Sequence, residues 1–412
     1  MVGGLIFGGI ALVCVSLWMR ARYRMRSRSR YLLGETRREE AELSARAGVD
    51  LERFFILSQR LLWGQTQPDL FTVDLDAVIA ELLGEYPDFF VAHLVVAFIR
   101  REQGKDELAD EALARAREIE AKLDVAPERS LRHLLPTEDE WAGIPPKVSL
   151  QVVVPGVVWR VPAYFVHGKA PLHEVSNATI VRRRDGGLVI YNPVDVPLEI
   201  RDQILELGEV THLVIATKFH SHFIAATQKL FPGAKTYGVR GHLKNPPSKE
   251  LHFDGFLCEG GPLFPGEIDE FAFGGHEFEE VVMIHRDSRT AILHDLLVSN
   301  RAGLEGHTFW IRLYSFCWGI DERVGVLSYQ IILWTKFLSV RRTVRALLLA
   351  DVERVLVAHG PVVPAPGESP QLHRALGWVC QLGPIEHLVL IRDFFGGQPG
   401  FFRDFVRYMI RG

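Results

Sequence analysis

The sequence predicts a protein of the α/β class, in which a domain of mixed strands and helices follows a helical region and an N-terminal anchor. Three observations support this. The first 19 residues carry no charge, residues 31–125 show helical spacing of apolar side chains, and short β-branched runs alternate with helical patches from residue 151 onward. Strands mixed with helices in this way indicate an α/β domain of roughly 220–260 residues.

Length and composition fit a globular, multidomain protein. At 412 residues the chain can form two or three domains of roughly 100–200 residues each. Apolar residues make up 48% and charged residues 24%, and the net charge of -4 gives no reason to expect nucleic acid as a partner. The four cysteines have no C-x-x-C spacing, which indicates thiols in a reducing compartment rather than a disulfide framework.

Residues 1–30 have the pattern of an uncleaved transmembrane anchor. Val2 to Met19 is about the minimum length that crosses a hydrocarbon core as a helix, and six arginines follow at every second position from Arg20 to Arg30. A cleavable signal peptide carries its charge before the apolar run. The positive-inside rule then predicts a single-pass membrane protein with the bulk of the chain in the cytoplasm. The alternative is a buried N-terminal helix followed by a basic tail that binds nucleic acid.

Residues 31–125 are predicted to be helical. The segment 85–123 indicates two antiparallel helices with a turn at Gln103-Gly104, and it resembles one tetratricopeptide unit. Ala97 supplies the small residue that the first helix needs, and one face of the second helix carries Ala109, Leu113 and Ala116. A single unit buries no core alone, so an ordinary helical hairpin is the alternative. Either could dock a protein partner. A linker with four prolines follows at 126–150.

The α/β domain is predicted to span residues 151–365, with a helical and aromatic insertion at 301–350. Lys336 and the pair Arg341-Arg342 argue against a second membrane span in the insertion, so we expect a helix that covers the core. The remaining residues, 366–412, are predicted to form a C-terminal helical segment.

Metal-capable side chains follow four predicted strands of this domain. They are His220 and His222 in VIATKFHSHF, His276 in AFGGHEF, Asp295 in AILHDLL and His359 in VLVAHGP. Strand ends are suitable places for such groups, because rigid elements aim the side chains and the adjoining loops give access.

The order of these segments resembles the metallo-β-lactamase fold. VTHLVIATKFHSHFIAATQKLFPGAKTYG resembles the strand, histidine motif, helix and short strand of that superfamily. GGHEFEEVVMIHRDSRTAILHDLL and VLVAHGP resemble its later histidine, aspartate and final histidine segments. The likeness covers about residues 150–365 and is greatest to an uncharacterised branch with a reduced histidine motif. It implies an αββα sandwich preceded by the anchor and the small helical region.

The resemblance also implies a set of metal ligands. His220, His222 and His276 would form a three-imidazole site, Asp295 would be the bridging carboxylate, and His359 would belong to a second site. Such a donor set suits one zinc ion and leaves a position for water, which could attack an ester, an amide or a phosphoester. No catalytic base can be assigned from the sequence.

The sequence departs from the full family motif, H-x-H-x-D-H, at several positions. Ile224 and Ala225 replace its aspartate and last histidine, and Asn192 replaces an expected acid, so we do not expect a two-metal site. A second register is open: counting from Thr217 leaves only His220 as a histidine ligand within the motif.

Each candidate also has a structural interpretation. His220 and His222 could be solvated loop residues, His276 a turn residue, and Asp295 a cap for the turn that follows it. Gly360 favours a functional His359, because glycine lets backbone approach a site closely. His294 is predicted to face away from Asp295.

Two functions remain open. One is a membrane-anchored, single-metal hydrolase of a small or lipid-derived substrate. The other is a non-catalytic binding or scaffolding module that kept the fold and lost the binuclear site.

Overall fold

The structure is a computed structural model that describes ten segments of the chain. They are residues 43–66, 73–123, 131–166, 170–244, 251–274, 278–300, 307–321, 324–326, 336–361 and 369–381. The predicted anchor, residues 1–30, lies outside them, as does most of the predicted C-terminal segment. Within the described segments, no helix combines the length and the apolar character needed to cross a membrane. The chain divides into two units, and both sheets belong to the unit Glu52–Cys380.

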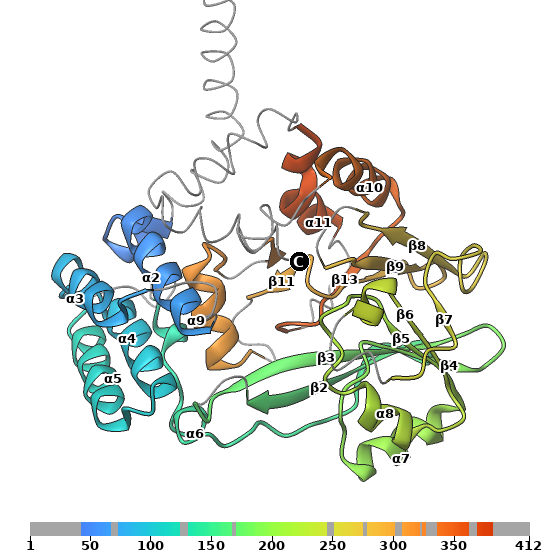
Figure 1. Ribbon diagram of the computed structural model, residues 1–412, viewed down its shortest axis with the longest axis horizontal. Helices are drawn as coiled ribbons and strands as arrows, with labels where there is room; N and C mark the ends of the chain where they lie inside the picture. The colour runs from blue at the N-terminus through green and yellow to red at the C-terminus, as the bar shows by residue number, and fades with distance from the viewer. Residues whose placement is uncertain are drawn as a thin grey trace, which may run out of the picture. The chain divides into compact units, whose positions relative to one another are not determined.

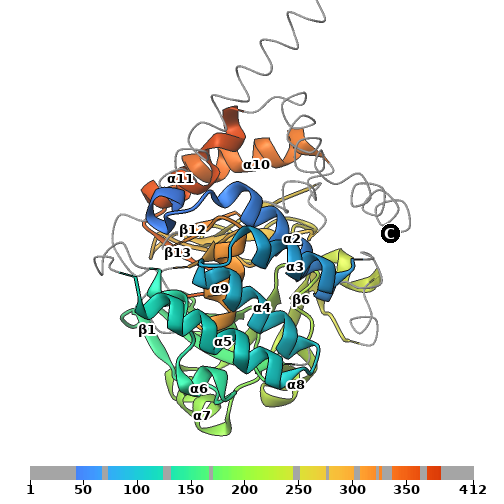
Figure 2. The same cartoon turned by 90° about the vertical axis from the view of Figure 1, so that its left-hand side faces the viewer.

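The helical region contains four principal helices, α2 (Leu51–Thr66), α3 (Leu75–Glu85), α4 (Phe90–Glu102) and α5 (Asp106–Ala121). α4 and α5 form the predicted hairpin, and Gly104 in the turn has φ +73°, a left-handed conformation that suits glycine. α4 is buried on nearly every side from Phe90 to Ile99. It is therefore the central helix of this region (Figures 1 and 2).

The linker is hydrogen-bonded to the predicted insertion. Its short helix α6 (Glu138–Trp141) carries Glu140, which accepts hydrogen bonds from Arg312 Nη1 and Nη2 at 2.8 and 2.7 Å. Glu140 also accepts the backbone N–H of Phe309, the first residue of α9 (Phe309–Cys317), at 2.8 Å. One largely buried carboxylate thus fixes the start of the aromatic helix α9.

The first sheet has seven strands in the order β1 to β7. Strands β1 to β4 pair antiparallel, and β4 to β7 pair parallel, with α7 (Leu198–Leu207) and α8 (Ile224–Leu230) as the crossover helices. The strands are β1 (Gln151–Val154), β2 (Val158–Val166), β3 (His173–Arg182), β4 (Leu188–Tyr191), β5 (Val210–Ile215), β6 (Lys235–Gly238) and β7 (Gly255–Phe256).

The second sheet has four strands in the order β13-β10-β9-β8. β10 and β13 are parallel, and the other pairs are antiparallel. A separate two-stranded pair is formed by β11 (Val298–Ser299) and β12 (Val324–Gly325). The four strands are β8 (Ile268–Ala272), β9 (Val281–His285), β10 (Thr290–Ile292) and β13 (Arg354–Leu356).

The two sheets enclose one apolar core and carry helices on their outer faces. Tyr191 and Val214 of the first sheet share a buried cluster with Met283 and Ile292 of the second. Leu213, which precedes Val214 in β5, points to the other face, because side chains alternate along a strand. There it packs in a cluster that includes residues of α7. On the second sheet α10 (Phe337–Leu349) packs against β8.

This arrangement is an αββα sandwich (Figure 1), so this part of the predicted architecture is confirmed. α10 is the helix that was expected to cover the core. Its apolar stripe, at the spacing of an amphipathic helix, is buried. The stripe consists of Phe337, Val340, Val344 and Leu347.

The turn after β13 depends on Gly360. This residue has φ +96°, and a Cβ atom added to it would overlap the carbonyl oxygen of Ser299. Because the two backbones lie this close, the Ser299 N–H donates a hydrogen bond to the carbonyl of His359, at 3.1 Å. Asn177 Nδ2 donates to the carbonyl of Gly360 at 2.7 Å, so the turn is held from two directions.

We predict that Gly360→Ala lowers the free energy of unfolding by at least about 2 kcal/mol, because both the left-handed backbone and the overlap with Ser299 oppose a methyl group. Urea denaturation measures this. Gly84→Ala is the control, since Gly84 lies in α3 with open space around it and should be neutral or slightly stabilising. Equal stability of Gly360→Ala and the unmodified protein would contradict the assignment.

A second prediction concerns His242, which is fully buried and stacks on Phe253 with ring centroids 5.3 Å apart. Burial lowers the pKa of His242 from 6.5 to about 4, against the opposing effect of two nearby backbone carbonyls. A folded-state pKa below the unfolded value means that the stability contribution is present above pH 6.5. That contribution is lost as the pH falls toward 4.

His242→Gln removes this titration. The slope of unfolding free energy against pH between about pH 6.5 and 4 should become shallower by up to about 1.4 kcal/mol per pH unit, the value for one proton. Urea denaturation across this pH range measures the slope. An unchanged slope would show that His242 binds its proton equally well in both states.

Candidate metal centre

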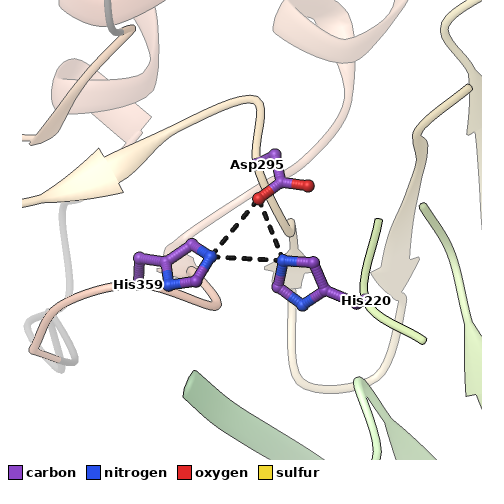
Figure 3. Close-up of side chains that lie close together, drawn as sticks. All are labelled: His220, Asp295 and His359. Carbon is purple, nitrogen blue, oxygen red and sulfur yellow. Dashed lines mark hydrogen bonds and ion pairs between the residues drawn. The ribbon is translucent and has the colours of Figure 1, made fainter. Parts of the chain in front are cut away.

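Three of the predicted residues lie together where strands of the two sheets end. His220 lies in the turn between β5 and α8, Asp295 follows β10, and His359 follows β13. β10 and β13 are parallel neighbours, so their carboxyl ends lie side by side. Figure 3 shows the three side chains directed toward one another from separate segments.

The ligand atoms of this trio are within 4.8 Å of one another. His220 Nε2 lies 2.9 Å from Asp295 Oδ1, and His359 Nε2 lies 3.3 Å from the same oxygen. The two Nε2 atoms are 3.2 Å apart. The side chains are only 10–15% exposed, so bulk water screens their interactions weakly.

The other nitrogen of His220 is held by Asn192. Asn192 follows β4 with φ +52°, a conformation that asparagine tolerates better than most residues. Its Nδ2 donates to Ser176 Oγ and to the carbonyl of Asn177, at 2.9 and 2.8 Å. Its Oδ1 therefore faces His220 Nδ1, at 2.5 Å, and accepts the Nδ1–H. In the neutral imidazole this fixes the lone pair on Nε2.

His359 is held in the same tautomer. Its Nδ1 lies 2.9 Å from the carbonyl of Val175, which can only accept, and 3.2 Å from Glu174 Oε1. Nδ1 is thus the donor, and Nε2 is left facing Asp295. A carboxylate or carbonyl behind a histidine is the usual support for a metal ligand, because it fixes the ring and raises its basicity.

Both supports come from one stretch of β3, Glu174–Asn177, which we call the β3 brace. Residues 174 and 175 contact His359 directly, and residues 176 and 177 hold His220 through Asn192. The β3 brace also holds the turn that carries His359, through the Asn177 N–H and side chain. Buried Arg160 donates to Asn177 Oδ1 at 2.7 Å and completes this network.

Asp295 is positioned by a second buried carboxylate. Glu280 is fully buried and accepts the backbone N–H groups of His294, Asp295 and Leu296 at 2.8, 2.9 and 2.6 Å. Burial and the charge of Asp295 raise the pKa of Glu280 to about 8, against the effect of these three donors. On the side chain of Asp295 itself, Oδ2 lies 3.2 Å from the Thr217 hydroxyl.

The electrostatics of the trio favour a charged centre. Burial would raise the pKa of Asp295, but His220 and His359 together hold it well below its usual value. Burial would likewise lower the pKa of His359, but the hydrogen bond to Asp295 and the charge of Glu174 raise it to about 9. The carboxylate therefore attracts positive charge to the point where the two Nε2 atoms face it.

The trio fits a divalent cation. Once a cation displaces the protons from Nε2, two imidazole nitrogens and a carboxylate oxygen would offer it three acceptor atoms, which lie 2.9–3.3 Å apart. For bonds of about 2.0–2.1 Å at tetrahedral angles, ligand atoms lie ~3.3 Å from one another. The observed spacing is close to this value, and the supported tautomers direct lone pairs inward.

The other two predicted ligands differ in position. His222 is exposed and is not among the three clustered residues. It lies two residues further along the turn, immediately before Phe223 and the start of α8. This agrees with the register counted from Thr217, in which only His220 is a histidine ligand of the motif. His276 lies outside the described residues.

His294 occupies an unexpected place. The alternation of a strand predicts that it faces away from Asp295, and it is fully buried. Its ring nevertheless lies edge-on to that of His220, with centroids 5.6 Å apart, and neither ring nitrogen has a hydrogen-bond partner among the described residues. Burial, followed by the charge of His220, lowers the pKa of His294 to about 3. His294 is therefore a neutral, buried ring that packs beside His220 at the edge of the centre.

Sequence reasoning missed the supporting residues Glu174, Asn177 and Glu280. No local signal marks them, because their roles depend on contacts 100 or more residues away or on a backbone turn. Asn192 was noticed only as a missing acid. The structure shows that its amide serves as the acceptor that an acid would supply.

Comparisons with known proteins find similarity to solved structures only. No family model and no curated protein matches the chain. The metallo-β-lactamase FIM-1 from Pseudomonas aeruginosa, in its mono-zinc form, is 16% identical over 60% of this chain and 97% of its own, with a TM-score of 0.40. The metallo-β-lactamase from Pontibacter korlensis is 14% identical over 57% of this chain and 99% of its own, with a TM-score of 0.39. The metallo-β-lactamase from Hirschia baltica is 12% identical over 57% of this chain and 98% of its own, with a TM-score of 0.39.

These solved structures belong to the superfamily whose fold the sequence resembles. At such identities and TM-scores the likeness concerns the course of the chain and carries no information on activity, substrate or metal. The sandwich itself is established by the two sheets and their helices in this chain.

Proposed function

We propose that the chain binds one divalent cation through His220, Asp295 and His359 and acts as a metal-dependent hydrolase. The observation that supports this best is the pair of Nδ1 hydrogen bonds, to Asn192 and to Val175, which leave both Nε2 atoms directed at one carboxylate oxygen.

Zinc is the cation we propose. Two imidazoles and one carboxylate form a donor set that catalytic zinc sites use, and three protein ligands leave a position free for substrate or water. The same set also suits iron(II), which metal analysis distinguishes. In the register counted from Thr217, Lys218 occupies the first histidine position of the motif and His222 its aspartate position. The proposal is therefore limited to a single ion.

Within such a centre each residue has a defined task. A bound divalent cation supplies Lewis acidity, which polarises a carbonyl or phosphoryl oxygen of an ester, amide or phosphoester substrate. Asp295 presents Oδ1 inward while the Thr217 hydroxyl holds Oδ2. Buried His294 excludes water from one side of His220. A lipid-derived substrate near a bilayer is the class that fits the proposed anchor.

The alternative is a non-catalytic binding or scaffolding module. One observation favours it: when the two rings are protonated, the Nε2–H groups of His220 and His359 can donate to Asp295 and join the ends of the two sheets without any ion. In that case the motif's lost ligand positions reflect a lost activity, and the helices α2 to α5 would be the docking surface for a protein partner.

Metal analysis decides between these functions. We predict about one equivalent of zinc-class metal per chain after purification, measured by inductively coupled plasma mass spectrometry. His220→Ala, His359→Ala and Asp295→Asn should each lose most of it. His222→Ala is the matched control from the same turn, and it should retain the metal because His222 lies outside the cluster.

The support of the ligands predicts a graded effect. Asn192→Leu removes the acceptor behind His220, and it should weaken metal affinity by about 10–100-fold without abolishing binding. Competition with a chromogenic chelator measures the affinity. A metal-free, correctly folded protein, or equal metal content in all the variants, would contradict the hydrolase proposal.

We also propose that residues 1–30 anchor the chain in a membrane, with the bulk of the chain in the cytoplasm. The support is the uncharged run of 19 residues followed by six arginines. Deleting residues 1–30 should move the protein from the membrane fraction to the soluble fraction on ultracentrifugation. Retention of the deleted protein in the membrane fraction after a carbonate wash would contradict a single anchor.

A further inference from the structure

The outward face of α10 has an unusual composition for the solvent side of an amphipathic helix. Its inward stripe is buried against the second sheet, so polar residues of both charges are expected outside. The outward residues at i, i+4, i+7 and i+11 are instead two leucines and two arginines. We call them the α10 outer stripe; they are Leu338, Arg342, Arg345 and Leu349.

The leucines of the α10 outer stripe are strongly exposed. Leu338 is 57% and Leu349 88% exposed, and Leu349 has the highest exposure of the large apolar side chains in the described segments. They are 11 residues apart, which corresponds to ~16 Å along a helix. The stripe therefore offers an apolar contact at each end with positive charge between them.

Among the residues that the structure describes, no acid neutralises the positive charge of this face. Residues 336–350 contain one lysine and three arginines and no acidic residue. Across the described segments, no carboxylate lies within ion-pair distance of Arg342 or Arg345, and Arg345 Nη2 donates to the carbonyl of Cys380 at 3.3 Å. Asp351, just beyond α10, is paired with Arg289.

We propose that the α10 outer stripe docks on an anionic lipid surface. Arginines attract acidic headgroups, each contributing ~1 kcal/mol near the surface, and exposed leucines at the same face can enter the boundary between headgroups and acyl chains. An acidic protein or a nucleic acid would use the arginines but leave two exposed leucines unexplained. The contact is independent of the metal centre, so it can hold or fail whatever that centre binds.

The test uses the full chain reconstituted with vesicles of phosphatidylcholine alone or mixed with phosphatidylglycerol. Arginine modification by phenylglyoxal, read by mass spectrometry, reports on each guanidinium. Arg342 and Arg345 should each be modified about fivefold more slowly with the acidic vesicles, the factor that ~1 kcal/mol per arginine implies. Exposed Arg117 on α5 is the control and should react equally with both.

Two further measurements identify the source of the protection. A Leu338→Ser/Leu349→Ser variant should lose much of it, because the apolar contacts with the lipid are removed at two side chains that are mostly exposed in the fold. Ionic strength of about 1 M should also remove it, since the Debye length is then ~3 Å. Equal modification of Arg342 and Arg345 in both vesicles would overturn the proposal. Protection by soluble polyglutamate but not by acidic vesicles would also overturn it and assign the face to an acidic protein.

Discussion

The tautomers of two histidines are the constraint on which the candidate centre depends. His220 and His359 come from different sheets, yet each gives its Nδ1–H to a fixed acceptor and turns Nε2 toward Asp295. Both acceptors belong to or are held by the β3 brace, so four residues of one strand determine which nitrogen each ring presents. Without it, each imidazole could present either nitrogen, and the three acceptor atoms would not face one point.

The sandwich explains why a single strand can do this. β3 lies beside β4, whose end carries Asn192, and the backbone of the β3 brace also pairs with the turn after β13. Gly360 lets that turn approach β11 closely, and Glu280 collects three N–H groups of the loop that carries Asp295. The centre is therefore built on hydrogen-bonded backbone at every ligand, which is how rigid sites are usually positioned.

Much of this could be predicted from the sequence, for identifiable reasons. Apolar runs that end in His220, Asp295 and His359 mark strand ends locally, and the order of segments indicated the sandwich. The choice between His220 and His222 could not be made, because both registers of the motif are possible until the start of α8 at Ile224 is known. The role of the β3 brace could not be predicted, because it depends on which strands become neighbours in the fold. The outer face of α10 was likewise predicted only as part of a helix covering the core.

The most direct test of the central claim is anomalous diffraction from crystals of the metal-bound protein, collected on both sides of the metal absorption edge. The account predicts one peak about 2.0–2.2 Å from His220 Nε2, His359 Nε2 and an oxygen of Asp295, with Asn192 and Val175 still bonded to the Nδ1 atoms. A protein without a peak there, or with a metal bound at His222 or at an Nδ1 atom, would contradict it.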